Sequence, residues 1–350
     1  MIYASLSPLV SALAIIFTII LVLFILIYLL TNKIYNIAFG NRQDKTFLHF
    51  FTHEDYEGLN IEPIEFKSTN NNTLRGNIYF YNYETYKGVV IFAHGMGVGH
   101  LQYTHEINHF AKLGFKVVTY DNTGSSKSDG ESTGSLPQGI MDLKSCLDFI
   151  KTREDLKNYN KAIFGHSWGG YSTINVLPFV QEEDHVLCAV AMGAPFNSSE
   201  VLYEMLTRIS KVFKICGPFI SMIDKNRYGQ LAKMNTLASL ENTNIDILLI
   251  HGTKDHIVDY ESNFKFVEDN LKKENVTFLT VENKRHRPNI SFEATAYDEL
   301  IGKEGLELQK RKATDEEMKA YYDSLDYHKL VEFDESVMNT IDEFILKHFN

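Results

Sequence analysis

The sequence of 350 residues predicts an α/β protein whose β-sheet is mainly parallel, and three observations support this fold class. First, short apolar segments alternate with segments in which apolar residues recur at helical spacing, as in βαβ units. Second, the apolar segment 161–164 leads directly into the glycine-rich hexapeptide 165–170 and then into a helical segment. Third, polar residues stand directly after several apolar segments, where the ligand crevice of a parallel sheet lies.

The composition is that of an ordinary globular protein, with 44% hydrophobic and 23% charged residues. The formal net charge is −11 and no basic stripe stands out, so we expect no nucleic-acid partner. Cys146, Cys188 and Cys216 lie in apolar surroundings without metal-type spacing. We therefore expect buried small hydrophobic side chains and not a disulfide framework.

The N-terminal region, residues 1–35, contains an uncharged and almost wholly apolar segment from Pro8 to Leu30. At about 1.5 Å per residue, this segment is long enough to cross a hydrocarbon layer of about 30 Å, so we predict a transmembrane anchor. A cleaved signal peptide is the alternative. It is disfavoured because no basic residue precedes the segment, the segment is too long for a signal-peptide core, and no clear cleavage site follows.

The orientation of the anchor follows from the basic residues beside it. Lys33, Arg42 and Lys45 follow the apolar segment, and no Lys or Arg precedes it. The positive-inside tendency therefore predicts a single-pass protein whose long C-terminal part is cytoplasmic. Four glycosylation tripeptides would matter only in a lumen, and they begin at Asn71, Asn197, Asn275 and Asn289.

The rest of the chain is predicted to be a connector, residues 36–60, and one domain, residues 61–350. Short apolar segments predict β-strands at 61–68, 74–81, 88–93, 115–120, 161–164, 187–192, 245–250 and 276–281. Asparagine-rich residues between the first two strands predict a hairpin. Helical spacing predicts helices at 102–113, 139–152, 171–176, 261–271 and 335–349, and acidic residues 315–317 predict a helix start.

The segment 197–244 has no strand pattern and is too long for a plain crossover. Its apolar pairs recur at loose helical spacing, so we predict a helical lid over the ligand crevice. An ordinary two-helix insertion packed on the sheet is an equally good interpretation.

Ser167 is the candidate nucleophile. A strand, a sharp turn and a helix around it match the nucleophile elbow G-x-S-x-G, in which Gly165 and Gly169 leave room for neighbouring chain. Such a turn strains the serine backbone and exposes the hydroxyl at a helix N-terminus, where negative charge is favoured. Five-residue matches also arise by chance in glycine-containing loops, so the motif needs further support.

That support comes from an acid and a histidine that lie much further along the chain. A serine hydroxyl needs a histidine to take its proton, and the histidine needs an acid to orient it. Asp255 follows one predicted strand and His286 follows the next, which gives the chain order serine, acid, histidine. Asp259 is the alternative acid, and a surface histidine in a basic loop is the alternative interpretation of His286.

Three further histidines and two arginines lie within or beside these motifs. We expect His94, His166 and His251 to be hydrogen-bonded at strand ends and not to act as general bases. Arg285 and Arg287 would lower the pKa of His286 and attract an anionic head group if they faced the site. Side chains that point to solvent are the other interpretation of the two arginines.

Four ordered motifs resemble those of the α/β-hydrolase superfamily over nearly all of residues 61–350. Within it, the chain is similar to the bacterial branch related to monoacylglycerol lipases, lysophospholipases and serine aminopeptidases, chiefly through residues 114–130. Thr123 stands where this branch usually has arginine, and Ser125 and Ser126 replace a more glycine-rich stretch. The four motifs are residues 94–95, 165–169, 251–255 and His286.

The resemblance implies an α/β-hydrolase fold, an oxyanion hole formed by the backbone N–H groups of Met96 and Trp168, and neither a metal nor another cofactor. Together with the predicted anchor and the apolar lid, the triad predicts a membrane-anchored serine hydrolase that cleaves a lipid ester or another apolar acyl ester through an acyl-Ser167 intermediate. A peptidase, a thioesterase and a non-catalytic binding module of the same fold are the alternatives. The oligomeric state stays open.

Overall fold

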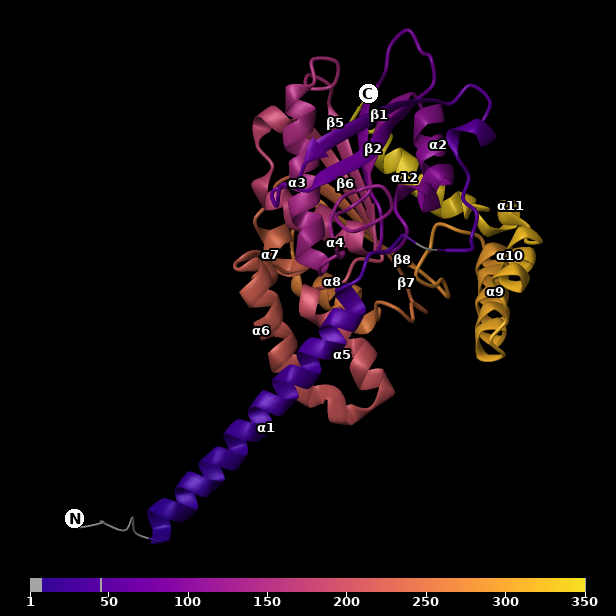
Figure 1. Ribbon diagram of the computed structural model, residues 1–350. Helices are drawn as coiled ribbons and strands as arrows, with labels where there is room; N and C mark the ends of the chain where they lie inside the picture. Colours follow the sequence, from indigo (N-terminus) through magenta and orange to yellow (C-terminus); the bar gives the residue numbers. More distant parts are fainter. Residues whose placement is uncertain (1–7, 45, 350) are drawn as a thin grey trace.

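The computed structural model describes residues 8–44 and 46–349 (Figure 1). Residues 1–7 of the predicted anchor region, together with Lys45 of its basic flank, lie outside the described residues.

Helix α1 (Pro8–Phe39) extends away from the rest of the molecule and then joins it (Figure 1). It is long and apolar enough to cross a membrane, a character that anchors share with signal sequences, and its most apolar stretch is not buried. The helix continues nine residues beyond the predicted apolar span and includes residues 36–39 of the predicted connector. Tertiary packing explains the extension, because Tyr35 and Phe39 are buried against helices that follow later in the chain.

The sheet has the order β1-β2-β4-β3-β5-β6-β7-β8. The strand β1 pairs antiparallel with β2, as does β2 with β4, and the other neighbouring strands are parallel. This arrangement confirms the predicted hairpin and the mainly parallel sheet. The strands are β1 (Asn60–Lys67), β2 (Thr73–Phe80), β3 (Gly88–Ala93), β4 (Phe115–Tyr120), β5 (Lys161–His166), β6 (Val186–Met192), β7 (Asp246–Gly252) and β8 (Val276–Val281).

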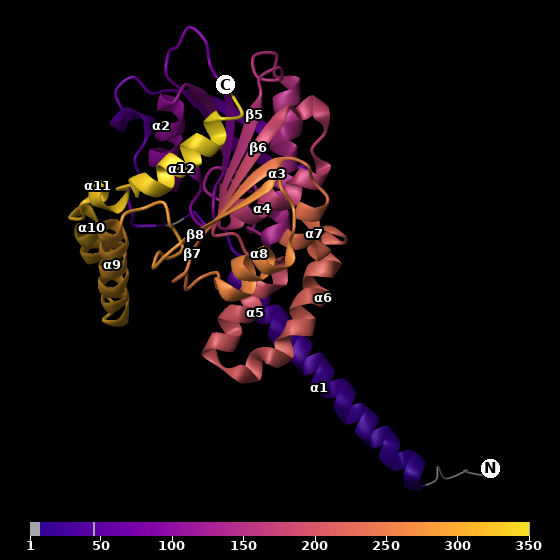
Figure 2. The ribbon, with the colours of Figure 1, turned by 180° about the vertical axis from the view of Figure 1, so that it is seen from behind.

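Helices cover both faces of the sheet and bury its apolar side chains. One face carries α2 (Thr104–Lys112) and α12 (Glu335–Leu346), which lie side by side in Figure 2. The other face carries α3 (Leu136–Thr152), α4 (Trp168–Val176), α7 (Thr236–Glu241) and α8 (Phe266–Asn270). The described cysteines are all buried and unpaired, as predicted.

Two groups of helices lie outside this three-layer body. The segment 197–244 contributes α5 (Ser198–Ile209), the 3₁₀ turn η5 (Lys211–Cys216) and α6 (Gly217–Tyr228), which pack against α1. The C-terminal part contributes α9 (Phe292–Lys310), α10 (Asp315–Asp323) and α11 (Tyr327–Leu330) on the far side of the molecule (Figure 1). The start of α10 agrees with the prediction from the acidic residues 315–317, whereas α9 has no counterpart among the predicted helices.

Candidate active site

Ser167 lies at the sharp turn between β5 and α4, with φ 55° and ψ −117°. Backbone strain of this kind costs about 1–3 kcal/mol in proteins and persists only where the surroundings enforce it. The enforcing contact is close backbone packing, since a Cβ atom on Gly169 would lie 1.9 Å from the carbonyl oxygen of Ala93, and one on Gly165 would lie 2.2 Å from that of Gly169. The predicted strand, turn and helix are all present.

The structure brings together the three side chains that sequence predicts for a triad. His286 Nε2 lies 2.8 Å from Ser167 Oγ, and His286 Nδ1 lies 2.7 Å from Asp255 Oδ2. These distances allow the serine O–H to donate to Nε2 while the Nδ1–H group donates to the carboxylate. The arrangement can accept a proton from the serine hydroxyl and stabilise the resulting imidazolium.

Asp255 is fixed from several sides. Its Oδ1 atom accepts hydrogen bonds from the backbone N–H groups of Ile257 and Val258, at 2.8 Å and 3.0 Å. His251 Nε2 lies 3.2 Å from Oδ2. Burial by itself would raise the pKa of Asp255, but the hydrogen bonds from His251 and His286 outweigh it and hold the pKa well below its usual value. Asp255 is therefore a carboxylate at neutral pH.

The alternative acid has a different role in the structure. Asp259 Oδ1 accepts hydrogen bonds from the backbone N–H group and the hydroxyl of Ser262, at 3.0 Å and 2.9 Å. It caps the turn that leads into α8 and takes no part in the contact with His286. The geometry therefore favours Asp255 as the orienting acid.

A series of three hydrogen bonds behind the triad links two loops of the site. The backbone N–H of Gly95 donates to Tyr103 Oη at 3.2 Å, and the tyrosine O–H lies 2.9 Å from His166 Nδ1. His166 Nε2 then donates to the backbone carbonyl of His286 at 2.8 Å. Burial holds the pKa of His166 well below its usual value, so this ring stays neutral. A neutral ring can accept the hydrogen bond from Tyr103 and donate the one to His286.

The other two strand-end histidines also have structural positions, as expected. His94 accepts a hydrogen bond at Nε2 from the backbone N–H of Asn122, and its Nδ1 faces the carbonyl of Gly95. His251 donates from Nε2 to the carbonyl of Val258 and also touches Asp255. Sequence reasoning did not identify Tyr103 as a partner, because only the fold brings it to His166.

Each of the two arginines beside His286 is paired with a carboxylate. Arg285 is partly exposed and lies 2.6 Å from Glu299. Arg287 bonds to the buried carboxylate of Glu106, and its guanidinium lies 5.5 Å above the ring of Tyr103. The expectation of a solvent-facing side chain is therefore wrong for Arg287, because a buried acid on α2 draws it inward.

The two N–H groups expected to form the oxyanion hole come from different elements. Met96 follows β3 and lines the same cavity as Ser167. Trp168 is the first residue of α4, so its N–H group belongs to the free end of the helix, while its indole donates to the carbonyl of Leu136. Their joint role as an oxyanion hole stays a prediction.

The triad opens into a cavity of about 800 Å³. Its inner wall includes Met96, Ser167 and His286, and its outer wall comes mainly from α9. Within the described chain, no residue of 197–244 is among those that line this cavity, and the role of this segment as a lid stays a prediction. Leu202, Leu206 and Ile220 of that segment are buried against α1. The lining residues from α9 are Thr295, Asp298, Glu299, Gly302, Lys303 and Leu306.

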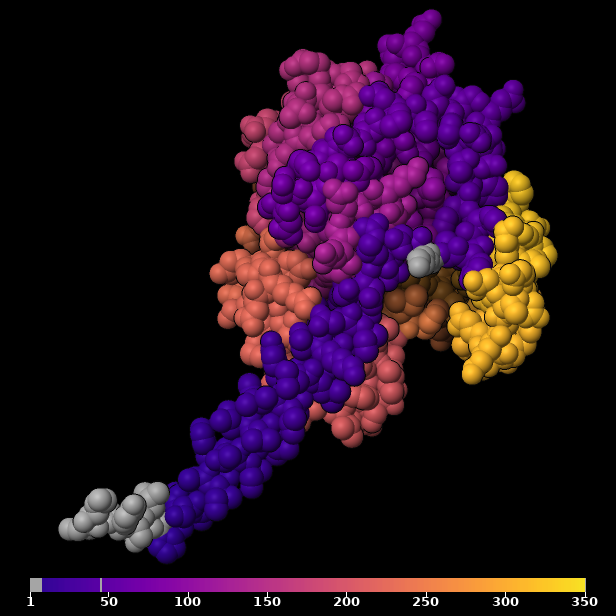
Figure 3. All heavy atoms as spheres, viewed as in Figure 1, coloured from indigo at the N-terminus to yellow at the C-terminus, as the bar shows by residue number. Residues whose placement is uncertain are grey.

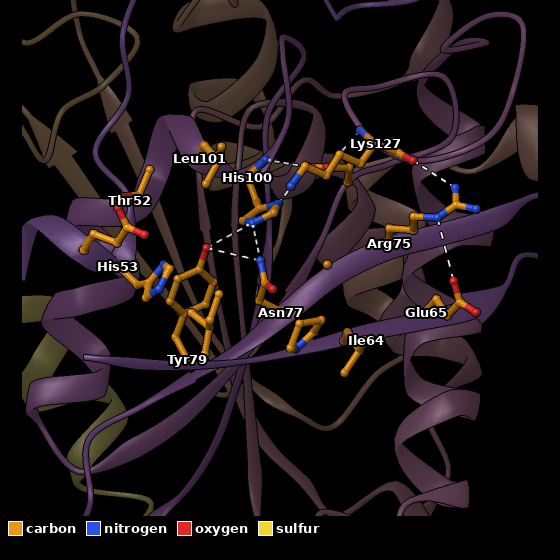
Figure 4. Close-up of a pocket in the computed structure, with 15 residues that line it drawn as sticks. Thr52, His53, Ile64, Glu65, Arg75, Asn77, Tyr79, His100, Leu101 and Lys127 are labelled. Atoms are coloured by element: carbon orange, nitrogen blue, oxygen red, sulfur yellow. Dashed lines mark hydrogen bonds and ion pairs between the residues drawn. The ribbon is translucent and has the colours of Figure 1, made fainter. Parts of the chain in front are cut away.

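A second cavity, of about 600 Å³, lies over β1 and β2 (Figure 4). Buried His100 is central to it, with Nδ1 2.7 Å from Asp121 Oδ1 and Nε2 3.1 Å from Tyr79 Oη. Figure 4 shows Arg75 turned toward Glu65 at its edge. None of the triad residues lines this cavity. Across residues 8–44 and 46–349, no group of three or more His, Cys, Asp or Glu side chains is placed to hold a metal ion.

Comparisons with known proteins agree with this fold. Residues 84–230 match the family model Hydrolase_4, described as serine aminopeptidase, S33. The uncharacterized protein YfhR of Escherichia coli strain K12 is 24% identical over 197 residues, which cover 56% of this chain and 62% of that relative. The same protein from strain O157:H7 is 24% identical over 198 residues. The chain thus spans less than two thirds of the length of these curated relatives.

Solved structures resemble a larger part of the chain. The Pyrococcus furiosus esterase Pf2001 has 21% sequence identity and a TM-score of 0.55, and the similarity covers 77% of this chain and 97% of that protein. Acetyl xylan esterase 1 from Thermoanaerobacterium has 14% identity and a TM-score of 0.51, with 77% and 92% covered. At these identities the likeness concerns the fold. The chain thus has the α/β-hydrolase fold, and its residues 84–230 match the family model of the serine aminopeptidases.

Proposed function

We propose that this protein is a membrane-anchored serine hydrolase that cleaves a carboxylic ester through an acyl-Ser167 intermediate. The observation that carries the proposal is the unbroken hydrogen-bonded relay from Ser167 Oγ through His286 to Asp255, with distances of 2.8 Å and 2.7 Å. Such a relay makes a weak nucleophile reactive at neutral pH.

In the first half of the reaction, Ser167 Oγ attacks the ester carbonyl carbon while its proton passes to His286 Nε2. Asp255 stabilises the imidazolium, and the N–H groups of Met96 and Trp168 would stabilise the oxyanion. The C–O bond to the leaving alcohol then breaks, and His286 gives its proton to that alcohol. The acyl group remains on Ser167.

In the second half, water attacks the acyl carbon and gives a proton to His286. The bond from that carbon to Ser167 Oγ breaks, Ser167 recovers its proton from His286, and the carboxylic acid leaves. His286 thus acts twice as base and twice as acid.

A lipid ester or another apolar acyl ester is the proposed substrate class. Apolar side chains at the cavity, including Met96, Ile257 and Leu306, favour an acyl chain. The apolar helix α1 would hold the cavity near a bilayer, with the domain on the cytoplasmic side because Lys33 and Arg42 follow its apolar part.

Turnover of p-nitrophenyl esters by the full chain in detergent tests the proposal. We expect hydrolysis by the wild type and its loss in Ser167→Ala, whose fold is checked by thermal denaturation. A panel of acyl chain lengths, thioesters and peptides then separates esterase, thioesterase and peptidase. A folded wild type that turns over no member of the panel would favour a non-catalytic binding module.

A further inference from the structure

The hairpin formed by α5, η5 and α6 carries both buried and exposed apolar side chains. Its inner side is buried against the C-terminal part of α1, where Leu202, Leu206 and Ile220 pack with Tyr35 and Phe39. This contact is reinforced by polar groups, because Tyr35 O–H and Ser198 O–H both donate to the buried carboxylate of Asp224. The hairpin is therefore fixed to α1 and is not a freely hinged flap.

The hairpin also exposes a second set of apolar side chains, which we call the outer patch. A surface helix of a water-soluble domain normally turns a polar face outward. Here four exposed positions carry large apolar side chains, and an exposed apolar patch marks an interaction site. The outer patch consists of Met205, Ile209, Val212 and Ile215, with exposed fractions of 51%, 75%, 77% and 52%.

The hairpin that carries the outer patch lies beside the end of the apolar part of α1. The ring of Phe219, at the start of α6, lies 4.9 Å from the ring of Phe24 and 6.4 Å from that of Tyr28. About 20 helical residues cross the hydrocarbon layer, and 20 residues from Pro8 end at Ile27. Phe219 is therefore level with the exit of α1 from a bilayer, and Figure 3 shows this hairpin in contact with α1.

Two lysines lie next to residues of the outer patch in the sequence. Lys211 and Lys214 alternate with its residues in η5, and both are exposed. Among the described residues, neither lysine has an acidic partner within ion-pair distance. Apolar side chains with interspersed lysines suit the boundary between acyl chains and anionic head groups.

We propose that the outer patch inserts into the interfacial layer of the same bilayer that α1 crosses. The inference rests on the membrane anchor of the proposed function and adds a second contact with the lipid. A bilayer suits this patch better than a second protein copy does, because the patch extends the exposed apolar surface of α1 near the depth where α1 leaves the bilayer.

This contact would place the catalytic cavity at the membrane surface. Arg208, in the last turn of α5, donates a hydrogen bond to the backbone carbonyl of His256. His256 and Ile257 line the cavity that holds Ser167. A hairpin seated in the interfacial layer thus holds the rim of the cavity beside the lipid, so an acyl substrate can enter without crossing water.

Depth-dependent fluorescence quenching tests the inference with the full chain. Val212→Trp is reconstituted into phosphatidylcholine and phosphatidylglycerol vesicles, with and without phospholipids brominated on the acyl chain. The wild type supplies the background of its single tryptophan, Trp168, which is buried. Ile209→Trp serves as an independent second probe if Val212→Trp folds poorly.

Two control variants give the quenching expected inside the bilayer and in water. Leu13→Trp lies in the exposed apolar part of α1, and Tyr83→Trp replaces an exposed residue before the amino end of β3, at the sheet edge opposite Ser167. We expect brominated lipid to quench Val212→Trp nearly as strongly as Leu13→Trp, while Tyr83→Trp is unaffected.

Strong quenching of Leu13→Trp together with none at positions 209 and 212 would overturn the inference and leave the anchor intact. Quenching of none of the probes would overturn the anchor and the inference together. Ester turnover by the same preparations is read separately, so failure of the hydrolase proposal is distinguished from both outcomes.

Discussion

His166 donates a hydrogen bond from Nε2 to the backbone carbonyl of His286, across 2.8 Å. The residue that precedes the nucleophile therefore holds the loop that carries the base. The two imidazole rings lie 4.8 Å apart between centroids, and only the ring of His286 faces Ser167 Oγ. His166 thus acts as a positioning residue, and its own orientation depends on Tyr103.

Removal of the Tyr103 hydroxyl tests this relationship. Tyr103→Phe keeps the ring beneath Arg287 but removes the oxygen that joins Gly95 and His166. We expect kcat to fall about tenfold, which corresponds to about 1.4 kcal/mol, while KM stays unchanged. The control is Tyr81→Phe, which removes a hydrogen bond to Asn108 away from the site. Equal loss of kcat in both variants would contradict a positioning role.

Asp255→Asn tests the choice of acid. The asparagine can still accept from the N–H groups of Ile257 and Val258, but its NH₂ group then faces His286 Nδ1. This contact stabilises the wrong tautomer of the histidine, so we expect kcat to fall by a factor of about 10⁴. Asp259→Asn should retain most activity, and the reverse order of the two variants would exclude Asp255 as the orienting acid.

Gly169→Ala tests the packing that enforces the elbow. The new methyl group would lie 1.9 Å from the carbonyl oxygen of Ala93, so the backbone must shift. We expect the free energy of unfolding to fall by about 3 kcal/mol, measured by denaturant titration in detergent. Gly302→Ala in α9 is the matched control, because its methyl group meets no atom within 4 Å. An unchanged stability of Gly169→Ala would show that the elbow is not tightly packed.

The pH dependence of stability tests the buried ion pair of the second cavity. Burial alone would raise the pKa of Asp121, but the charge and hydrogen bond of His100 lower it to about 2. The folded-state pKa thus lies below the unfolded value of about 3.9, so ionised Asp121 stabilises the fold fully above pH 4 by about 2 kcal/mol. This contribution is lost as the pH falls from about 4 to about 2.

The comparison of wild type with Asp121→Asn isolates that contribution. We expect the difference between their melting temperatures to be largest above pH 4 and to shrink as the pH approaches 2. A difference that stays constant across this range would show that the ionisation of Asp121 is not coupled to folding.

The sequence predicted the sheet well where strands are continuously apolar. The bounds of β3, β4 and β8 agree with the predicted ones. The strand β3 is buried on both faces, and such a strand leaves a run of apolar residues that no helix pattern imitates. The same regularity placed Ser167, Asp255 and His286 at strand ends. The fold then brought these three residues into contact.

The features that the sequence did not predict depend on contacts between residues that are far apart in the chain. The helix α9 buries little more than Ala294, Ile301 and Gly305, so its apolar face is too small to give a helical signal. The extension of α1 through Phe39 depends on α5 and α6, and the inward turn of Arg287 depends on Glu106. None of these partners can be read from local spacing.

Labelling of the wild-type chain with a fluorophosphonate probe tests the central proposal most directly. The probe reacts with serines that a base activates, so mass spectrometry should find one phosphonylated peptide, carrying the adduct on Ser167. Ser167→Ala should remain unlabelled, and His286→Ala should react far more slowly. A folded wild type that stays unlabelled, or that carries the adduct on another serine, would contradict the account.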